Sequence, residues 1–217
     1  AVASLVALLA LPTLATDAEQ ASNGVREKLA FPPSALPYLI GVMALFSMVP
    51  EGAILDWSAR YLQSELSADI GVAALAFAAF SGTMAVVRFC GDLIRRKWGA
   101  VKTLRVSSCI AIVGLLGGGM APTAEVAILA FALAGIGIAN MVPIAFSAAG
   151  NIPGLPTGIG LSVVTVMGYS GILVAPSLIG LIAEQTGFSL IFSSLAALLT
   201  ITMLLSPLAR HADFRPE

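Results

Sequence analysis

Charged residues are scarce in this sequence. Asp, Glu, Lys and Arg make up 11% of the 217 residues, and the net charge is −1, whereas an ordinary soluble domain carries about 25% charged residues. The chain therefore lacks the basic surface that nucleic-acid recognition requires. We expect no nucleic-acid partner.

Cysteine and histidine are also rare. Cys90 and Cys109 lie in or beside apolar segments without a C-x-x-C spacing, which argues against a disulfide framework and a zinc site. The single histidine, His211, lies in the polar tail, so a serine or metal hydrolase that depends on histidine is disfavoured. We expect no metal, no cofactor and no enzymatic activity.

Long apolar runs are what the sequence has in abundance: 58% of its residues are hydrophobic. A membrane-spanning helix needs about 20 apolar residues, and six segments meet or approach this length, namely residues 37–57, 70–90, 104–121, 126–147, 157–183 and 187–208. A shorter run, residues 1–15, is interpreted as the truncated end of a preceding helix. The sequence thus predicts an all-α, polytopic membrane helix bundle.

The segment between the first two apolar runs divides the chain. Residues 16–36 are polar and contain Pro32 and Pro33, which indicates a surface linker longer than most connections within a domain. The predicted organisation is a truncated helix (1–15), a cytoplasmic linker (16–36), a six-helix bundle (37–208) and a cytoplasmic tail (209–217).

Basic residues fall mainly in alternate breaks between the apolar runs. Among the second, fourth and sixth breaks only Arg60 is basic, and the fifth has no basic residue. Because basic loops stay on the cytoplasmic side during insertion, the pattern predicts an integral membrane protein, in a bacterial inner membrane, with a cytoplasmic C-terminus. The basic residues in the first and third breaks and the tail are Arg26, Lys28, Arg95, Arg96, Lys97, Lys102, Arg105, Arg210 and Arg215.

Two carboxylates lie within or at the outer end of the 37–57 segment. An ionised carboxylate at membrane depth costs several kcal/mol unless it is hydrated or paired, so Glu51 and Asp56 are candidate proton or substrate groups. Pro50 and Gly52 are expected to interrupt the helix beside Glu51. Trp57 would mark the outer interface and border the site. Alternatively, the helix ends near Val49 and both acids lie in an outer loop.

A second interruption is predicted in the 126–147 segment, where Gly135 and Gly137 precede Asn140 and Pro143. If the six helices form two groups of three, both interruptions fall in the first helix of a group, and such correspondence is the best sequence pointer to a transporter's binding site. Asn140 would hydrogen-bond the substrate there. Alternatively, it makes an ordinary interhelical hydrogen bond.

Arg88 and Asp92 are four residues apart and are expected to pair on one helix face. The following Arg95 and Arg96, with Gly99, form either a cytoplasmic anchor or a conformational latch.

The stretch from Arg88 through Gly91-Asp92 to Gly99 resembles the loop signature of the major facilitator superfamily, in an Arg-x-x-Gly-Asp form similar to the fucose-permease-like branch. The segment from Glu51-Gly52 to Asp56-Trp57 also resembles that branch, and Gly168, Gly171 and Pro176 resemble the bendable eleventh helix of such proteins. The signature's latch residues would be Arg88, Gly91, Asp92, Arg95, Arg96 and Gly99.

The resemblance implies that the chain is the C-terminal half of a secondary transporter: the end of helix six plus helices seven to twelve. It further implies alternating access of a small solute, sugar-like and proton-coupled, with the N-terminal half of the same protein and the lipid bilayer as partners.

Two other functions fit part of the sequence pattern. A seven-helix receptor fits the helix count, although a light-driven pump would need a lysine in residues 187–208, which contain none. An intramembrane aspartyl protease would use Asp56 and Asp92. However, these residues are expected at opposite ends of neighbouring spans, and the Gly-x-Gly-Asp form is absent from Phe89–Asp92.

Overall fold

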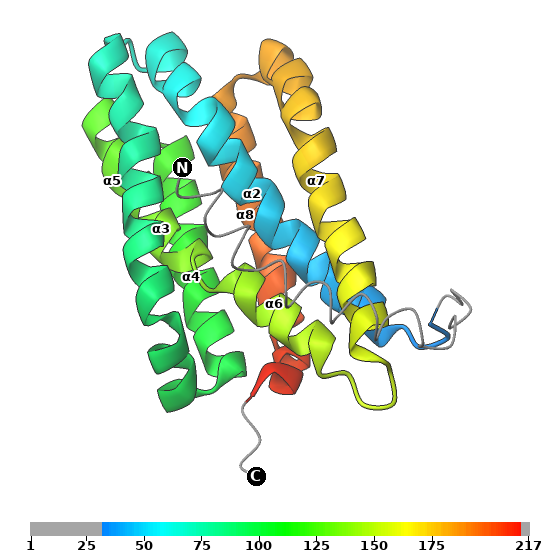
Figure 1. The fold of residues 1–217 in the computed structure, drawn as a ribbon. Helices are drawn as coiled ribbons and strands as arrows, with labels where there is room; N and C mark the ends of the chain where they lie inside the picture. The colour runs from blue at the N-terminus through cyan, green and yellow to red at the C-terminus, as the bar shows by residue number, and fades with distance from the viewer. Residues whose placement is uncertain (1–31, 214–217) are drawn as a thin grey trace, which may run out of the picture. The chain divides into compact units, whose positions relative to one another are not determined.

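The computed structural model describes residues 32–213, and these residues form helices and no strands, which confirms the all-α prediction (Figure 1). Residues 1–15 and nearly all of the predicted linker lie outside the described residues, as do residues 214–217. The elements are α2 (Leu36–Glu65), α3 (Ile70–Trp98), α4 (Ala100–Gly119), α5 (Ala124–Ile138), α6 (Met141–Gly150), α7 (Thr157–Thr186), α8 (Phe188–Leu204) and the 3-10 helix η1 (Ser206–Ala212).

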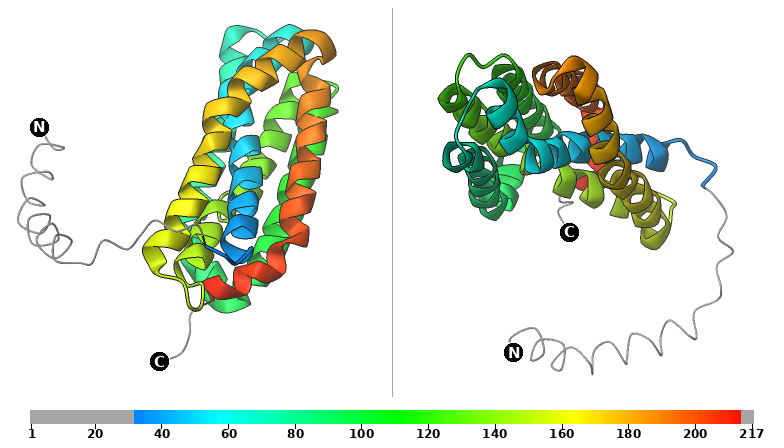
Figure 2. Two further views of the ribbon diagram at one scale, coloured as in Figure 1. Left: turned by 90° about the vertical axis from the view of Figure 1, so that its right-hand side faces the viewer. Right: turned by 90° about the horizontal axis from the view of Figure 1, so that it is seen from above.

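The helices run alternately up and down, so that successive spans are antiparallel (Figures 1 and 2). We call the end that holds Glu65, Gly119 and Thr186 the upper end, and the end that holds Trp98 and η1 the lower end. Helix α2 contacts α3, α6, α7 and α8, so it lies at the centre of the bundle.

Five spans in the described part of the chain are long and apolar enough to cross a membrane, with α5 and α6 together forming one of them. The sixth predicted span, residues 187–208, is instead α8 followed by η1, bent by 57°. Helix α2 extends to Glu65, beyond the predicted end at residue 57, because Ser58 to Glu65 are all compatible with a helix and Tyr61 and Leu62 are buried.

The expected interruption at Pro50 is wrong, because α2 is one continuous helix with Pro50 inside it. Proline removes a single hydrogen-bond donor from the helix, and neighbouring helices let membrane helices tolerate that loss. The alternative, in which the helix ends near Val49, is also wrong, since Glu51 and Asp56 both lie within α2.

The second interruption is confirmed: α5 ends at Ile138 and α6 begins at Met141. A Cβ atom at position 137 would lie 2.6 Å from the Ser107 carbonyl oxygen of α4, and one at position 135 would lie 2.5 Å from the Phe80 carbonyl oxygen of α3. Gly135 and Gly137 therefore let α5 pack directly against two helix backbones.

The joints α3–α4 and α7–α8 have the same form at opposite ends of the bundle. Each is a single glycine, Gly99 (φ 77°, ψ 158°) or Gly187 (φ 82°, ψ 159°). A distant carboxylate caps the next helix in each case: Asp213 accepts from the Ala100 N–H, and Glu65 accepts from the Phe188 N–H. This repetition indicates that two three-helix units are related by inversion.

Helix α7 packs on α2 through small residues. Cβ atoms at Gly168 and Gly171 would lie 2.7 Å from the Met48 Sδ and 2.5 Å from the Leu45 Cδ1. Pro176 lies inside α7, which is continuous.

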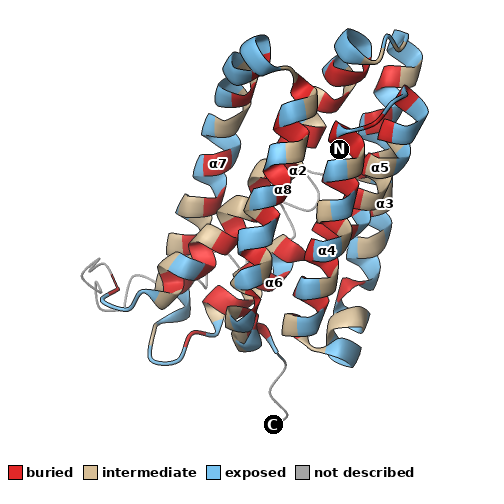
Figure 3. Ribbon diagram, turned by 180° about the vertical axis from the view of Figure 1, so that it is seen from behind, coloured by how far each residue is buried: buried red, intermediate tan, exposed pale blue. Residues whose placement is uncertain are grey.

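Burial differs sharply between helices (Figure 3). Only 22% of the apolar window is buried in α3 and in α7, compared with 50% in α2. Helices α3 and α7 therefore present long faces that no described helix covers.

Candidate functional site

An ion pair joins two spans at mid-depth. The Arg88 Nη2 of α3 lies 2.9 Å from the Glu51 Oε1 of α2, and the side chains are 39% and 15% exposed, respectively. Glu51 lies fifteen residues after Leu36 and fourteen before Glu65, which places it about 21 Å from either end at 1.5 Å per residue. Pairing removes most of the cost of holding each charge at that depth.

Arg88 also reaches the helix break. Its Nε donates to the Ala139 carbonyl oxygen at 3.2 Å. In a continuous helix that carbonyl would accept from the N–H of residue 143, but Pro143 has none. Arg88 thus satisfies an acceptor that the sequence itself leaves free, and it links α2, α3 and the α5–α6 junction.

Asn140 lies on the other side of the junction. It is 6% exposed, and its Oδ1 occupies the space that a Cβ atom at Gly91 would need. Gly91 therefore allows α3 to approach the α5–α6 break closely. The structure thus brings Glu51, Arg88, Gly91 and Asn140 into one contiguous region, which we call the central site.

The central site opens to the surface through Arg88. A groove of about 360 Å³ is lined by Arg88 together with Met84, Ala85 and Phe89. It lies on the poorly covered side of α3, where Phe89 is 90% exposed. The guanidinium is therefore accessible, while the Glu51 carboxylate is largely covered.

Asp56 and Trp57 are not part of the central site. Asp56 is exposed, and the Trp57 ring stacks on Phe188 with centroids 5.3 Å apart. Asp56 is also far from Asp92: counted along the antiparallel helices from the upper end, they lie about 20 Å apart in depth at 1.5 Å per residue. That separation disfavours a shared-proton aspartyl site.

The predicted pair of Arg88 with Asp92 is wrong. Arg88 pairs with Glu51, and Asp92 pairs with Arg95 at 3.4 Å. The Asp92 side chain is 81% exposed. Water therefore screens its carboxylate, which attracts Arg88 less strongly than the covered carboxylate of Glu51 does. Arg96 lies in the last turn of α3, and Gly99 forms the joint to α4; a latch function for this region stays a prediction.

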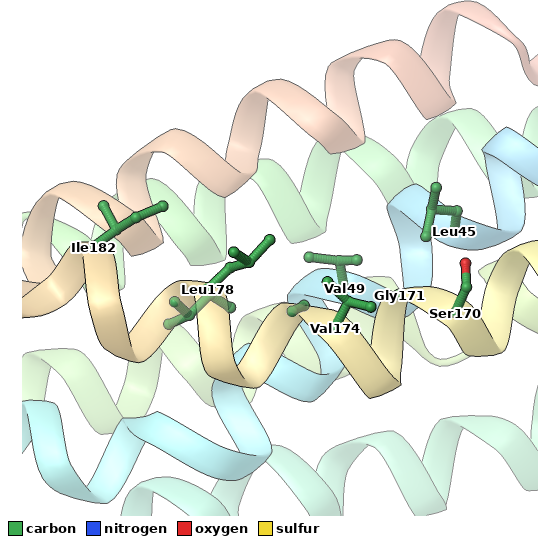
Figure 4. A pocket seen from close by; sticks show the side chains of 9 residues that line it. Leu45, Val49, Ser170, Gly171, Val174, Leu178 and Ile182 are labelled. Carbon is green, nitrogen blue, oxygen red and sulfur yellow. The ribbon is translucent and has the colours of Figure 1, made fainter.

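Two features of this region are not among those predicted from the sequence. The first is the Ala139 carbonyl as a partner of Arg88, for which Pro143, four residues later, is the signal. The second is an apolar pocket of about 380 Å³ between α2 and α7, lined among others by Leu45, Val49, Val174 and Leu178 (Figure 4). Gly171, predicted as a packing residue, also borders this pocket.

No protein-family model matches the chain. Three curated relatives are similar to it: the uncharacterized transporter y4wD of Sinorhizobium fredii (32% identical over 84% of this chain), an uncharacterized MFS-type transporter of Yersinia pestis (34% over 77%) and the membrane protein MosC of Rhizobium meliloti (33% over 82%). The alignments cover 48%, 44% and 44% of those proteins, so the chain spans about half the length of the relatives it matches.

Solved structures give the fold. The peptide transporter POT in complex with sulfate matches with a TM-score of 0.72 at 15% identity, covering 82% of this chain and 38% of that one. A POT variant with alafosfalin gives a TM-score of 0.71. The likenesses do not favour a receptor or a protease. The chain has the fold of one half of a major facilitator transporter, and two of its relatives are named as transporters, one of them of the MFS type.

Proposed function

We propose that this chain is the C-terminal half of a major facilitator secondary transporter, which moves a small solute by alternating access. The observation that carries the proposal is the Glu51–Arg88 pair at mid-depth, beside a broken helix. Ionisable groups at membrane depth mark solute and ion pathways, and broken helices line them.

The N-terminal half of the same protein would complete the cavity. The poorly buried helices α3 and α7 supply the faces for such a partner, and the relatives are about twice as long as the matched region. Rocking of the two halves would expose the central site to each side in turn.

The lower end is proposed to face the cytoplasm of a bacterial inner membrane. The third predicted break places Arg95, Arg96 and Lys97 at this end, whereas Arg60 lies near the upper end. Basic residues are retained on the cytoplasmic side. The Asp92–Arg95 pair, in which the carboxylate is exposed and the arginine is largely covered, would then serve as a cytoplasmic latch.

Glu51 is the proposed proton-coupling group. Protonation neutralises the carboxylate and breaks the ion pair, while Arg88 stays charged. A single group thereby changes the contacts of three spans. The resemblance to the fucose-permease-like branch supports a solute with sugar-like hydroxyl groups.

The test uses the full-length gene product in proteoliposomes, with labelled hexoses and hexose acids as probes. An inward proton gradient of one pH unit corresponds to about tenfold solute accumulation at one proton per solute. We expect accumulation in the wild type. The Glu51→Gln variant is expected to exchange solute across the membrane but to show no gradient-driven accumulation.

Glu125→Gln is the matched control, because Glu125 lies in the first turn of α5 at the upper end, far from the central site. It should accumulate solute like the wild type. Full gradient-driven accumulation in Glu51→Gln would contradict the coupling role, and the absence of any uptake or exchange by the wild type would contradict the transporter function.

A further inference from the structure

We infer, on the basis of the proposed transport function, that the solute is a small carboxylate that binds Arg88, and that Glu51 is a built-in competitor which this carboxylate displaces.

The guanidinium of Arg88 has donors to spare. Of its five N–H groups, the contacts within residues 32–213 engage Nε, which donates to Ala139, and one N–H of Nη2, which donates to Glu51. The bond to a backbone carbonyl fixes the Nε side of the plane. Once Glu51 is displaced, both terminal nitrogens are available to form a bidentate pair with a carboxylate.

The local charge selects an anion. Arg88 is the only basic residue at mid-depth in the described part of the chain, and it is permanently charged. A cationic solute would be repelled by it, whereas a neutral solute would leave the Glu51–Arg88 pair in place. A solute carboxylate can form the same kind of ion pair with Arg88 as the Glu51 carboxylate does.

No other charged group in the described part of the chain forms an ion pair with Glu51. In the helices packed against α2, and in α2 itself, Arg88 alone makes an ionic contact with Glu51. The other charged or titratable residues on these elements are Asp56, Arg60, Glu65, Tyr38, Tyr61, Cys90, Asp92, Arg95, Arg96, Lys97, Glu125, Tyr169, Glu184, Arg210 and His211.

The groove beside Arg88 fits a small molecule. Its volume of about 360 Å³ is at the lower end of the range for small-molecule sites, about 300–1,000 Å³. Met84, Ala85 and Phe89 would contact the carbon skeleton. A sugar acid combines this carboxylate with the hydroxyl groups of the solute proposed above.

Displacement couples the solute to a proton. Once a solute carboxylate takes Arg88, the Glu51 carboxylate is unpaired at membrane depth, which costs several kcal/mol. Glu51 therefore takes up a proton. The solute anion and the proton enter together: the Glu51–Arg88 pair becomes a solute–Arg88 pair plus neutral Glu51, and the net charge of the site is unchanged.

The experiment measures the thermal unfolding midpoint of the purified full-length gene product in detergent, between pH 5.5 and pH 7.5. The probes are gluconate, lactate and, as the neutral counterpart of gluconate, glucose. We expect gluconate or lactate to raise the midpoint and glucose to have no effect. Carboxylate affinity should rise as the pH falls, by up to about tenfold per pH unit.

Variants distinguish the role of Glu51 as the competitor from the role of Arg88 as the group that binds the carboxylate. Glu51→Gln is expected to bind the carboxylate more tightly than the wild type at pH 7.5, with no pH dependence over this range. Arg88→Gln and the charge-neutral double variant Glu51→Gln/Arg88→Gln should not bind it. Arg60→Gln, which removes an exposed arginine near the upper end, should behave like the wild type.

Weaker or equal binding by Glu51→Gln, retained binding by Arg88→Gln, or stabilisation by glucose but by neither carboxylate would overturn the inference. The wild-type pH dependence tests it even if a variant fails to fold. Glucose uptake into proteoliposomes without carboxylate binding would overturn the carboxylate assignment and leave the transport function standing.

Discussion

At the scale of single residues, Gly91 is a position where adding one methyl group should have a measurable effect. A methyl group there would occupy the space of the Asn140 Oδ1, and Asn140 is buried at the α5–α6 junction. Gly91 thus matters because of the closeness of the two helices rather than backbone freedom, since it lies inside α3.

We predict that Gly91→Ala lowers the free energy of unfolding by about 1–3 kcal/mol, the usual cost of overpacking. Replacing Asn140 with alanine removes the side chain that the new methyl group would meet. The double variant Gly91→Ala/Asn140→Ala should therefore lose less unfolding free energy than the sum of the losses in the two single variants. Thermal unfolding of the four proteins of this double-mutant cycle measures the coupling.

Gly82→Ala is the control on the same helix, because a Cβ atom there meets nothing within 4 Å. That change should be neutral or stabilise α3 by up to about 1 kcal/mol, since alanine favours a helix over glycine. If Gly82→Ala and Gly91→Ala destabilised the protein equally, the loss at position 91 would not come from the contact with Asn140.

At the scale of elements, hydropathy predicts the spans well because the bilayer sets their length. Pro50 and Pro143 look alike in sequence, yet only the second accompanies a break. The partner of Arg88 was not predictable from local spacing, because Glu51 is 37 residues away in the chain. An i,i+4 pattern identifies Asp92 but carries no information about a neighbouring span.

The two glycine joints lead to a prediction for the connected helices. Glu65 accepts hydrogen bonds from the Phe188 and Ser189 N–H groups at the start of α8, so it supplies the cap that the helix lacks locally. We expect Glu65→Ala to destabilise the protein by about 1–2 kcal/mol, the usual cost of losing an N-cap. Asp213→Ala should have a similar effect on α4.

The matched control is Glu184→Ala, which removes an exposed carboxylate from α7 near the same end. Its unfolding midpoint in detergent should stay close to that of the wild type. If Glu184→Ala and Glu65→Ala lowered the midpoint equally, the loss would reflect net charge at the upper end rather than capping.

At the scale of the whole molecule, the position of the central site and the distribution of basic residues can both be described along the direction of the antiparallel spans. Glu51 and Arg88 lie at mid-depth, and Arg95, Arg96 and Lys97 gather in the last turn of α3 at the lower end. A site near the middle of the spans suits alternating access, because it can be exposed to each side in turn.

Orientation is directly measurable with single cysteines. In a background with Cys90 and Cys109 replaced by serine, Gln185→Cys lies at the upper end and Pro153→Cys in the α6–α7 loop at the lower end, and both positions are exposed. A membrane-impermeant maleimide added to intact cells should label position 185 and leave position 153 unlabelled, because the basic lower end stays in the cytoplasm. Permeabilised cells are the control, in which both positions should react. Labelling of position 153 alone in intact cells would show that the lower end faces outward, contrary to the proposal. The coupling proton would then enter the central site from the opposite surface.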